Sequence, residues 1–400
     1  MRRFSSSYIL ATIFSFLLIA CHSNSQKASA RTNNSGFHET PIKALPMPLI
    51  YDTMSVQTTE IIRQLDKFYN AQIRAGFNGS VLIGYQGRII YERYFGYSNK
   101  EAKIPLNTTS SDQLASVSKT FTGAAVLYLF EHKYLDINEH VQTYLPTFPY
   151  PNITLKMLLT HRSGLADYSH WYLRHVNDFS TPISNKIMLD MMAKFKPALE
   201  FKPDTRFKYC NTNYALLALV IEKVTEMSYP DFMSKYIFEP LGMEHTFVFS
   251  PSAGLPSNAT ISYNRNWKRE QVMFADGVYG DKGIYSTPED MYRWDQSFYQ
   301  RKLLSNETIE LAYGPCSFER PGVKNYGLGW RMLCFPNGNK VIYHNGWWHG
   351  NNTSFYRFIK DNLTIIVLGN RFNNGIYRQA PQIYSILRGV PVQKGFDSED

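Results

Sequence analysis

The segment Ser116-Val117-Ser118-Lys119 has the residue types and spacing for nucleophilic catalysis, and no other Ser-x-x-Lys occurs in the 400 residues. A serine hydroxyl is a weak nucleophile at neutral pH and needs a base within hydrogen-bond reach. On a helix, the three-residue spacing places Lys119 one turn from Ser116 on the same face. The apolar run from Gly123 to Phe130 predicts a buried helix that begins at this segment. Burial there would lower the pKa of Lys119 and make it a base.

Two further segments carry residues that could serve the same reaction. Tyr209-Cys210-Asn211 precedes an amphipathic, helix-like stretch, where a phenol could transfer a proton and an amide could hold a substrate amide. His344-Asn345-Gly346 follows the strand-like residues 340–343. His344 could donate a hydrogen bond to the tyrosine or the substrate, and Gly346 would let a substrate backbone lie close to the strand edge. Tyr-x-Asn recurs elsewhere in the chain, so neither segment is specific alone.

In this order and spacing, the three motifs resemble the serine β-lactamase and penicillin-binding superfamily, in its class C-like branch. The resemblance implies that Ser116 is the acylated nucleophile, that Lys119 activates it, and that Tyr209 is the general acid and base. It implies that Asn211 binds the acyl side of the substrate. It also implies an oxyanion hole formed by the backbone N–H groups of Ser116 and Trp347. The similarity spans about residues 57–390 and includes four more segments: Gly79–Gly84, Leu158–Leu165, Gly283–Thr287 and Tyr326–Trp330.

The chain departs from the β-lactamases of this superfamily at two places. It has His344-Asn345-Gly346 where those enzymes carry Lys-Thr-Gly, and Pro203-Asp204-Thr205 where Pro-Gly-Thr is usual. Because histidine is mostly neutral at pH 7, we expect the site to disfavour carboxylate-bearing substrates. We therefore predict a serine hydrolase that forms an acyl-enzyme on a D-amino-acid peptide or a small ester. Two alternatives remain open: a β-lactamase, and a penicillin- or peptide-binding lipoprotein without turnover. An α/β-hydrolase is disfavoured because no Gly-x-Ser-x-Gly occurs.

Strand-like segments near both ends of the chain frame a mostly helical middle. They occupy residues 79–96 and 328–369. This arrangement predicts an α/β (α+β) fold of the β-lactamase/transpeptidase-like type, with an antiparallel sheet flanked by helices and an inserted helical lobe. We expect one domain over residues 57–390, a tail over 391–400, and a monomer.

The N-terminal residues have the pattern of an export signal. Arg2 and Arg3 precede a mostly apolar run of twelve residues, 9–20, which is too short to span a bilayer. Leu18-Ile19-Ala20-Cys21 then resembles a bacterial lipobox. We expect residues 1–20 to be a signal peptide, Cys21 to carry lipid, and residues 21–56 to include a flexible tether. This predicts a lipoprotein of the bacterial cell envelope that is anchored to a membrane and faces the periplasm or the cell surface.

The remaining composition disfavours other classes of function. The formal charge is +9, but no basic run supports nucleic-acid binding. The histidines have no metal-ligand spacing, so we expect no metal and no cofactor, only a small-molecule or peptide substrate. Cys316 and Cys334 could form a disulfide in an oxidising compartment, but the sequence alone does not decide this.

Overall fold

The computed structural model describes residues 36–42, 47–52, 56–176 and 178–391. The predicted signal peptide, Cys21 and much of the predicted tether lie outside these residues, as does most of the predicted tail. These described residues belong to one compact unit. None of the described helices is long and apolar enough to cross a membrane.

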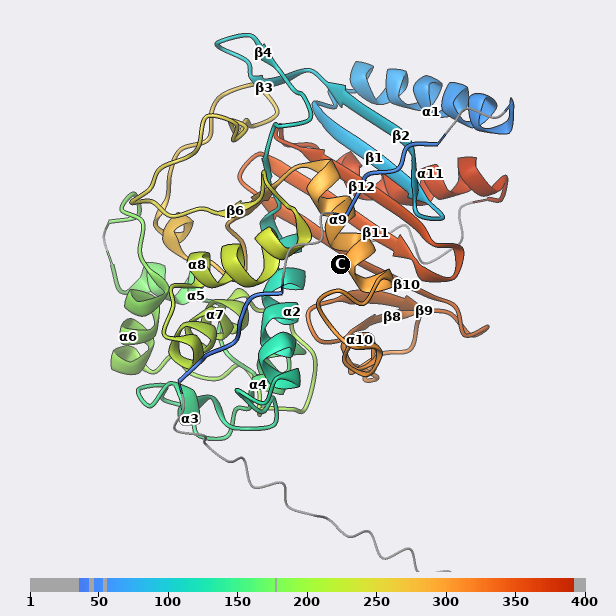
Figure 1. Ribbon diagram of the computed structural model, residues 1–400. Helices are drawn as coiled ribbons and strands as arrows, with labels where there is room; N and C mark the ends of the chain where they lie inside the picture. The colour runs from blue at the N-terminus through green and yellow to red at the C-terminus, as the bar shows by residue number, and fades with distance from the viewer. Residues whose placement is uncertain (1–35, 43–46, 53–55, 177, 392–400) are drawn as a thin grey trace, which may run out of the picture. The chain divides into compact units, whose positions relative to one another are not determined.

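A mixed fold is built around one antiparallel sheet, as the sequence predicted (Figure 1). In the described part of the chain its seven strands lie in the order β2-β1-β12-β11-β10-β9-β8. Gly79 at the start of β1 pairs with Gly369 at the end of β12, so segments from the two ends of the chain lie side by side. The strands are β1 (Gly79–Tyr85), β2 (Arg88–Phe95), β8 (Lys324–Tyr326), β9 (Arg331–Cys334), β10 (Lys340–Trp348), β11 (Asn351–Phe358) and β12 (Leu363–Gly369).

Helices cover both faces of this sheet, because successive residues of its central strands are apolar on both sides. Val81 and Ile83 of β1 face a core formed with α1 and α11, whereas Leu82 faces the larger core formed with α2, α7 and α9. The longer helices are α1 (Val56–Arg74), α2 (Ser118–Glu131), α6 (Asn185–Phe195), α7 (Asn211–Thr225), α9 (Pro288–Tyr299), α10 (Asn306–Ala312) and α11 (Gln379–Arg388).

The inserted part of the chain is mostly helical, with short elements between the longer helices (Figure 1). Its short helices are α3 (Val141–Tyr144), α4 (Leu155–Leu159), α5 (Tyr168–Trp171) and α8 (Tyr229–Met233). Two small sheets pair β3 (Tyr97–Asn99) with β4 (Ile104–Pro105), and β7 (Ile284–Ser286) with β5 (Asp112–Gln113) and β6 (Phe247–Val248).

Two features of the fold prepare the site. Helix α2 is buried from Ser118 to Leu129, which explains why its sequence is apolar on all sides. The turn before it is strained, because Ala115 adopts a left-handed φ of 49° at the start of the short 3₁₀ helix Ala115–Val117. Strand β10 pairs with β9 only over Lys340–Tyr343, and among the described residues no strand continues that edge beside 344–348. The site therefore lies between a helix start and an open strand edge.

Candidate active site

Ser116 and Lys119 meet as their spacing predicted. The Lys119 Nζ lies 3.1 Å from the Ser116 Oγ, 2.9 Å from the Asn211 Oδ1 and 2.7 Å from the backbone oxygen of Asp281. These partners come from the 3₁₀ turn, from the first residue of α7 and from the segment before β7. Elements far apart in the sequence thus converge on one amine.

The environment of Lys119 lowers the pKa of its ammonium group to about 8, chiefly because the side chain is fully buried. Asp281 and Asp167 oppose that effect, and Arg331 adds to it. The rings of Tyr209 and Tyr214 flank the amine, with their centroids 4.9 and 5.8 Å from the Nζ. A lysine with a pKa near neutrality can act as a base, as the sequence argument required.

Tyr209 lies beside this pair, just ahead of α7. Burial raises the pKa of its hydroxyl, while Arg331 and the Ser116 hydroxyl act in the opposite direction. The Tyr209 hydroxyl is buried and makes no hydrogen bond of ordinary geometry within the described residues. The Ser116 hydroxyl nevertheless acts on the pKa of Tyr209, and catalytic hydrogen bonds commonly reach good geometry only once substrate binds.

Hydrogen bonds hold both the side chain and the backbone of Asn211. Its side-chain oxygen accepts from Lys119, and its backbone N–H donates to the Asp167 carboxylate at 2.7 Å. Because the side-chain oxygen is used, the amide NH₂ remains for a substrate carbonyl, which agrees with the predicted acyl-side role.

His344 lies within β10, which continues beyond the predicted strand through Trp348. Burial, Arg331 and Lys119 together hold the pKa of His344 well below its usual value, so the ring is neutral at pH 7. Its Nδ1 lies 2.7 Å from the backbone oxygen of Asn345, which makes Nδ1 the donor, and its Nε2 lies 3.2 Å from the Tyr326 hydroxyl. The ring centroids of His344 and Tyr209 are 6.2 Å apart.

Gly346 packs too closely against its neighbours to leave space for a side chain. A Cβ at this position would lie 2.3 Å from the Thr353 Oγ1, 2.4 Å from the backbone oxygen of Leu114 and 3.0 Å from the backbone nitrogen of Ser116. One close neighbour is therefore the turn that carries Ser116. Trp347 follows on the open edge of β10, with its exposed indole bonded to the backbone oxygen of His349 at 2.9 Å.

Two charged or polar groups outside the three sequence motifs lie against Tyr209. The Arg331 guanidinium carbon is 5.1 Å from the Tyr209 ring centroid, and Arg331 is the first residue of β9, where the pairing with β10 ends. The buried His161 ring lies 4.4 Å from the Tyr209 ring and accepts from the Cys210 backbone N–H at 3.1 Å. The expectation about charge concerned only position 344, and Arg331 lies beside the same tyrosine. Replacement of lysine by His344 removes one cation, but Arg331 supplies another.

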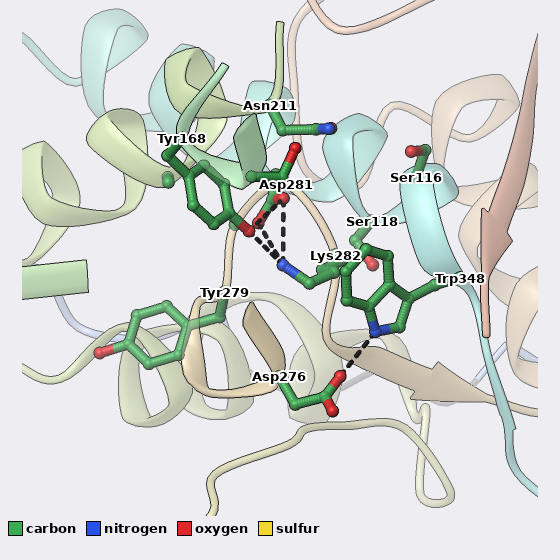
Figure 2. A network of polar contacts seen from close by, with 12 residues as sticks. Ser116, Ser118, Tyr168, Asn211, Asp276, Tyr279, Asp281, Lys282 and Trp348 are labelled. Carbon is green, nitrogen blue, oxygen red and sulfur yellow. Dashed lines mark hydrogen bonds and ion pairs between the residues drawn. The ribbon is translucent and has the colours of Figure 1, made fainter. Parts of the chain in front are cut away.

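A buried ion pair adjoins Lys119 through a backbone oxygen, and Figure 2 shows its two side chains. Asp281 and Lys282 form it, with 3.2 Å between the Asp281 Oδ2 and the Lys282 Nζ, and both contact the Tyr168 hydroxyl. The Trp348 ring covers the Lys282 amine at 4.6 Å, and its indole N–H donates to Asp276 at 2.6 Å. The adjacent Asp-Lys dipeptide before Gly283 was the only sign of this pair in the sequence.

Comparisons with known proteins show the family of this chain. A family model described as Beta-lactamase matches residues 61–384. The chain belongs to the beta-lactamase family. Penicillin-binding protein 4* of Bacillus subtilis is 34% identical over 318 residues, which are 76% of this chain and 70% of that protein. A D-aminopeptidase of Gluconobacter oxydans is 23% identical over 321 residues, 80% of this chain and 60% of that protein. This member of the family is a serine hydrolase.

Solved structures confirm the predicted fold class. A penicillin-binding protein from Bacillus halodurans has a TM-score of 0.69 at 21% identity and covers 84% of this chain and 98% of its own. An octameric penicillin-binding protein homologue from Pyrococcus abyssi has a TM-score of 0.71 at 24% identity, with coverage of 83% and 78%. At these identities the likeness shows the shared fold.

Cys316 and Cys334 are free thiols in the structure, as is Cys210. The disulfide that the sequence left open is therefore not formed here.

Proposed function

We propose that this beta-lactamase family member hydrolyses amides or esters through an acyl-enzyme on Ser116, and that its substrates are small peptides containing a D-amino acid. The contacts of Lys119 are the observation that carries the proposal. A neutral amine has two N–H groups and one lone pair. The oxygens of Asn211 and Asp281 accept the two N–H groups, at 2.9 and 2.7 Å. The lone pair is then directed to the Ser116 hydroxyl at 3.1 Å.

The reaction follows from this arrangement. Lys119 accepts the Ser116 proton while Oγ attacks the substrate carbonyl carbon, and backbone N–H groups of Ser116 and Trp347 stabilise the oxyanion. Tyr209 donates its proton to the leaving group when the amide or ester bond breaks, and the proton held by Lys119 then replaces it. A water molecule next loses a proton to the same groups while its oxygen attacks the acyl carbon, and that proton passes to the Ser116 Oγ when the acyl bond breaks.

Arg331 favours a peptide with a free carboxylate over a neutral ester. The leaving group must reach the Tyr209 hydroxyl to be protonated, and Arg331 lies against that ring and is partly exposed. A guanidinium in this place can pair with a carboxylate on the leaving-group side of the substrate. Relatives named penicillin-binding protein and D-aminopeptidase support a D-configured substrate.

Hydrolysis of β-lactams is the second candidate, because Arg331 also restores a cation for the carboxylate of a penicillin. Intact-mass analysis separates the possibilities after incubation with a D-alanyl-D-alanine peptide, its C-terminal amide, a short-chain ester, a penicillin and a neutral fluorophosphonate. A transient penicillin adduct with turnover would establish the β-lactamase, and a lasting one would indicate a penicillin-binding protein without turnover.

The variant Ser116→Ala provides the decisive control. We expect it to lose all labelling by the fluorophosphonate and all peptide turnover while retaining the wild-type melting temperature. Full turnover by this variant would place the reaction elsewhere and refute the proposal.

We also propose that the mature protein is a monomeric lipoprotein anchored through Cys21 in the bacterial cell envelope, on the strength of the lipobox-like residues. Cys21→Ser should move the protein from the membrane fraction to the soluble fraction. Retention in membranes after a high-salt wash would contradict the anchor. Because one structural homologue is octameric, light scattering of the purified protein is needed to test the monomer.

A further inference from the structure

The buried pair of Asp281 and Lys282 touches the catalytic amine through its backbone. The Asp281 carbonyl oxygen accepts from the Lys119 Nζ at 2.7 Å, while its side chain lies 3.2 Å from the Lys282 Nζ. Both side chains are at most 5% exposed. Water therefore screens neither charge, and each acts on the other and on Lys119 at close range.

The surroundings hold this pair in place. Gly280 and Gly283, on either side of it, adopt φ values of 93° and 94°. A Cβ at Gly280 would lie 2.5 Å from the backbone oxygen of Tyr214, so the segment packs directly on α7. Figure 2 shows Lys282 directed toward Tyr168 and Asp281 and next to Trp348. Burial lowers the pKa of Lys282, and Asp281 opposes that change.

Several elements direct charged or titratable groups at Lys119, and their charges must balance for it to remain a base. Two carboxylates face it, and both raise the pKa of Lys119. Arg331 lowers the pKa of Lys119. Lys119 in turn lowers the pKa of His161 and that of His344. The groups are Asp281 before β7, Asp167 before α5, Tyr209 and Cys210 before α7, Arg331 of β9, His344 of β10 and His161 after α4.

We propose that Lys282 is a positioning residue for the reaction: by neutralising Asp281 it keeps the carboxylate from holding Lys119 in its protonated form. The inference rests on the proposed roles of Ser116 and Lys119. Without Lys282, the Asp281 carboxylate would lose the cation 3.2 Å away and would stabilise the Lys119 ammonium more strongly. Without the Asp281 charge, Lys282 would repel a proton from Lys119. The two single variants must therefore change the protonation of Lys119 in opposite directions.

The test is the pH dependence of acylation by a neutral fluorophosphonate, whose labelling rate reports the fraction of unprotonated Lys119. In Lys282→Met we expect the midpoint of the acidic limb to move up by about one to three pH units, the usual effect of an uncompensated charge nearby. In Asp281→Asn the midpoint should move down. The double variant Asp281→Asn/Lys282→Met should return close to the wild-type midpoint. It also removes the buried unpaired charge that could unfold either single variant.

Matched controls separate this role from simple packing. Lys186→Met removes a lysine from an exposed pair with Asp190 and should leave the midpoint unchanged. Lys282→Arg keeps the charge and should restore the midpoint at least in part. Variants with reduced labelling but an unchanged midpoint, or single variants that shift in the same direction, would overturn the inference.

The same experiment distinguishes failure of the inference from failure of the proposed function. If wild-type labelling has no acidic limb, or if Ser116→Ala is labelled as fast as the wild type, then the assigned roles of Ser116 and Lys119 are wrong. If labelling of Ser116 has a clear acidic limb whose midpoint does not change in the Lys282 variants, only the proposed role of Lys282 is refuted.

Discussion

Arg331→Gln should abolish the expected preference of the enzyme for carboxylate-bearing over neutral substrates. The guanidinium carbon lies 5.1 Å from the Tyr209 ring, and the substrate's leaving group must contact the hydroxyl of that ring. Two unit charges about 5 Å apart interact by roughly 3 kcal/mol at an effective dielectric constant near 20. Partial exposure of Arg331 reduces this, and charge-assisted hydrogen bonds contribute about 1.5 to 3 kcal/mol. The expected loss is therefore roughly 10- to 100-fold.

The assay compares kcat/KM for a D-alanyl-D-alanine peptide with that for its C-terminal amide, which differ only in the charge beside Arg331. The ratio of the two values should fall in Arg331→Gln and should be partly retained in Arg331→Lys. Arg63→Gln, at an exposed residue of α1, should leave the ratio unchanged. An equal loss on both substrates would show that Arg331 acts only through the fold or through Tyr209, and the argument for a carboxylate-bearing substrate would fail.

Three further outcomes are expected. Because the pKa of Lys119 is about 8, fluorophosphonate labelling should rise about tenfold per pH unit below pH 8 and level off above it, and a flat profile from pH 6 to 9 would exclude Lys119 as the base. Gly346→Ala should slow labelling by about 100-fold, because its Cβ would displace the backbone at Ser116; unchanged labelling kinetics would show that the turn tolerates the shift. Burial raises the pKa of Asp112 to about 7, so the stability tied to its protonated form is present at low pH and lost as pH rises through 7. Unfolding by urea should show a decrease of roughly 3 kcal/mol between pH 5 and 8 that Asp112→Asn abolishes, and an identical pH dependence in both proteins would contradict this.

The parts of the site that lie close together in the sequence were predictable. The Ser116 and Lys119 spacing needs only helix geometry, and the apolar run after it predicted the buried helix α2. The strand-like segments near both ends of the chain, together with the family resemblance, predicted the antiparallel sheet. In each case a local pattern determines the structure, and tertiary contacts only reinforce it.

Charges that meet only through tertiary structure were not predictable. Arg331 reaches Tyr209 because β9 begins opposite Tyr343 of β10, a register that no local pattern specifies. Asp281 contacts Lys119 across 162 positions of the chain. His344 lies in a recognisable motif, whereas no local pattern marks Arg331 as a residue of the site. Electrostatic balance depends on distances in space, which residue spacing gives only within single helices and strands.

The pairing of β1 with β12 has a consequence for how the protein is made. Gly79 is synthesised early, whereas its partner Gly369 belongs to the last strand of the sheet. At about 5 to 20 residues per second, the partner follows tens of seconds later. During that interval the β1–β2 hairpin has an unpaired apolar edge that can associate with other chains. Ribosomal pausing late in the message, or a stop codon before β12, would therefore favour aggregation of a chain that already contains every residue assigned to catalysis.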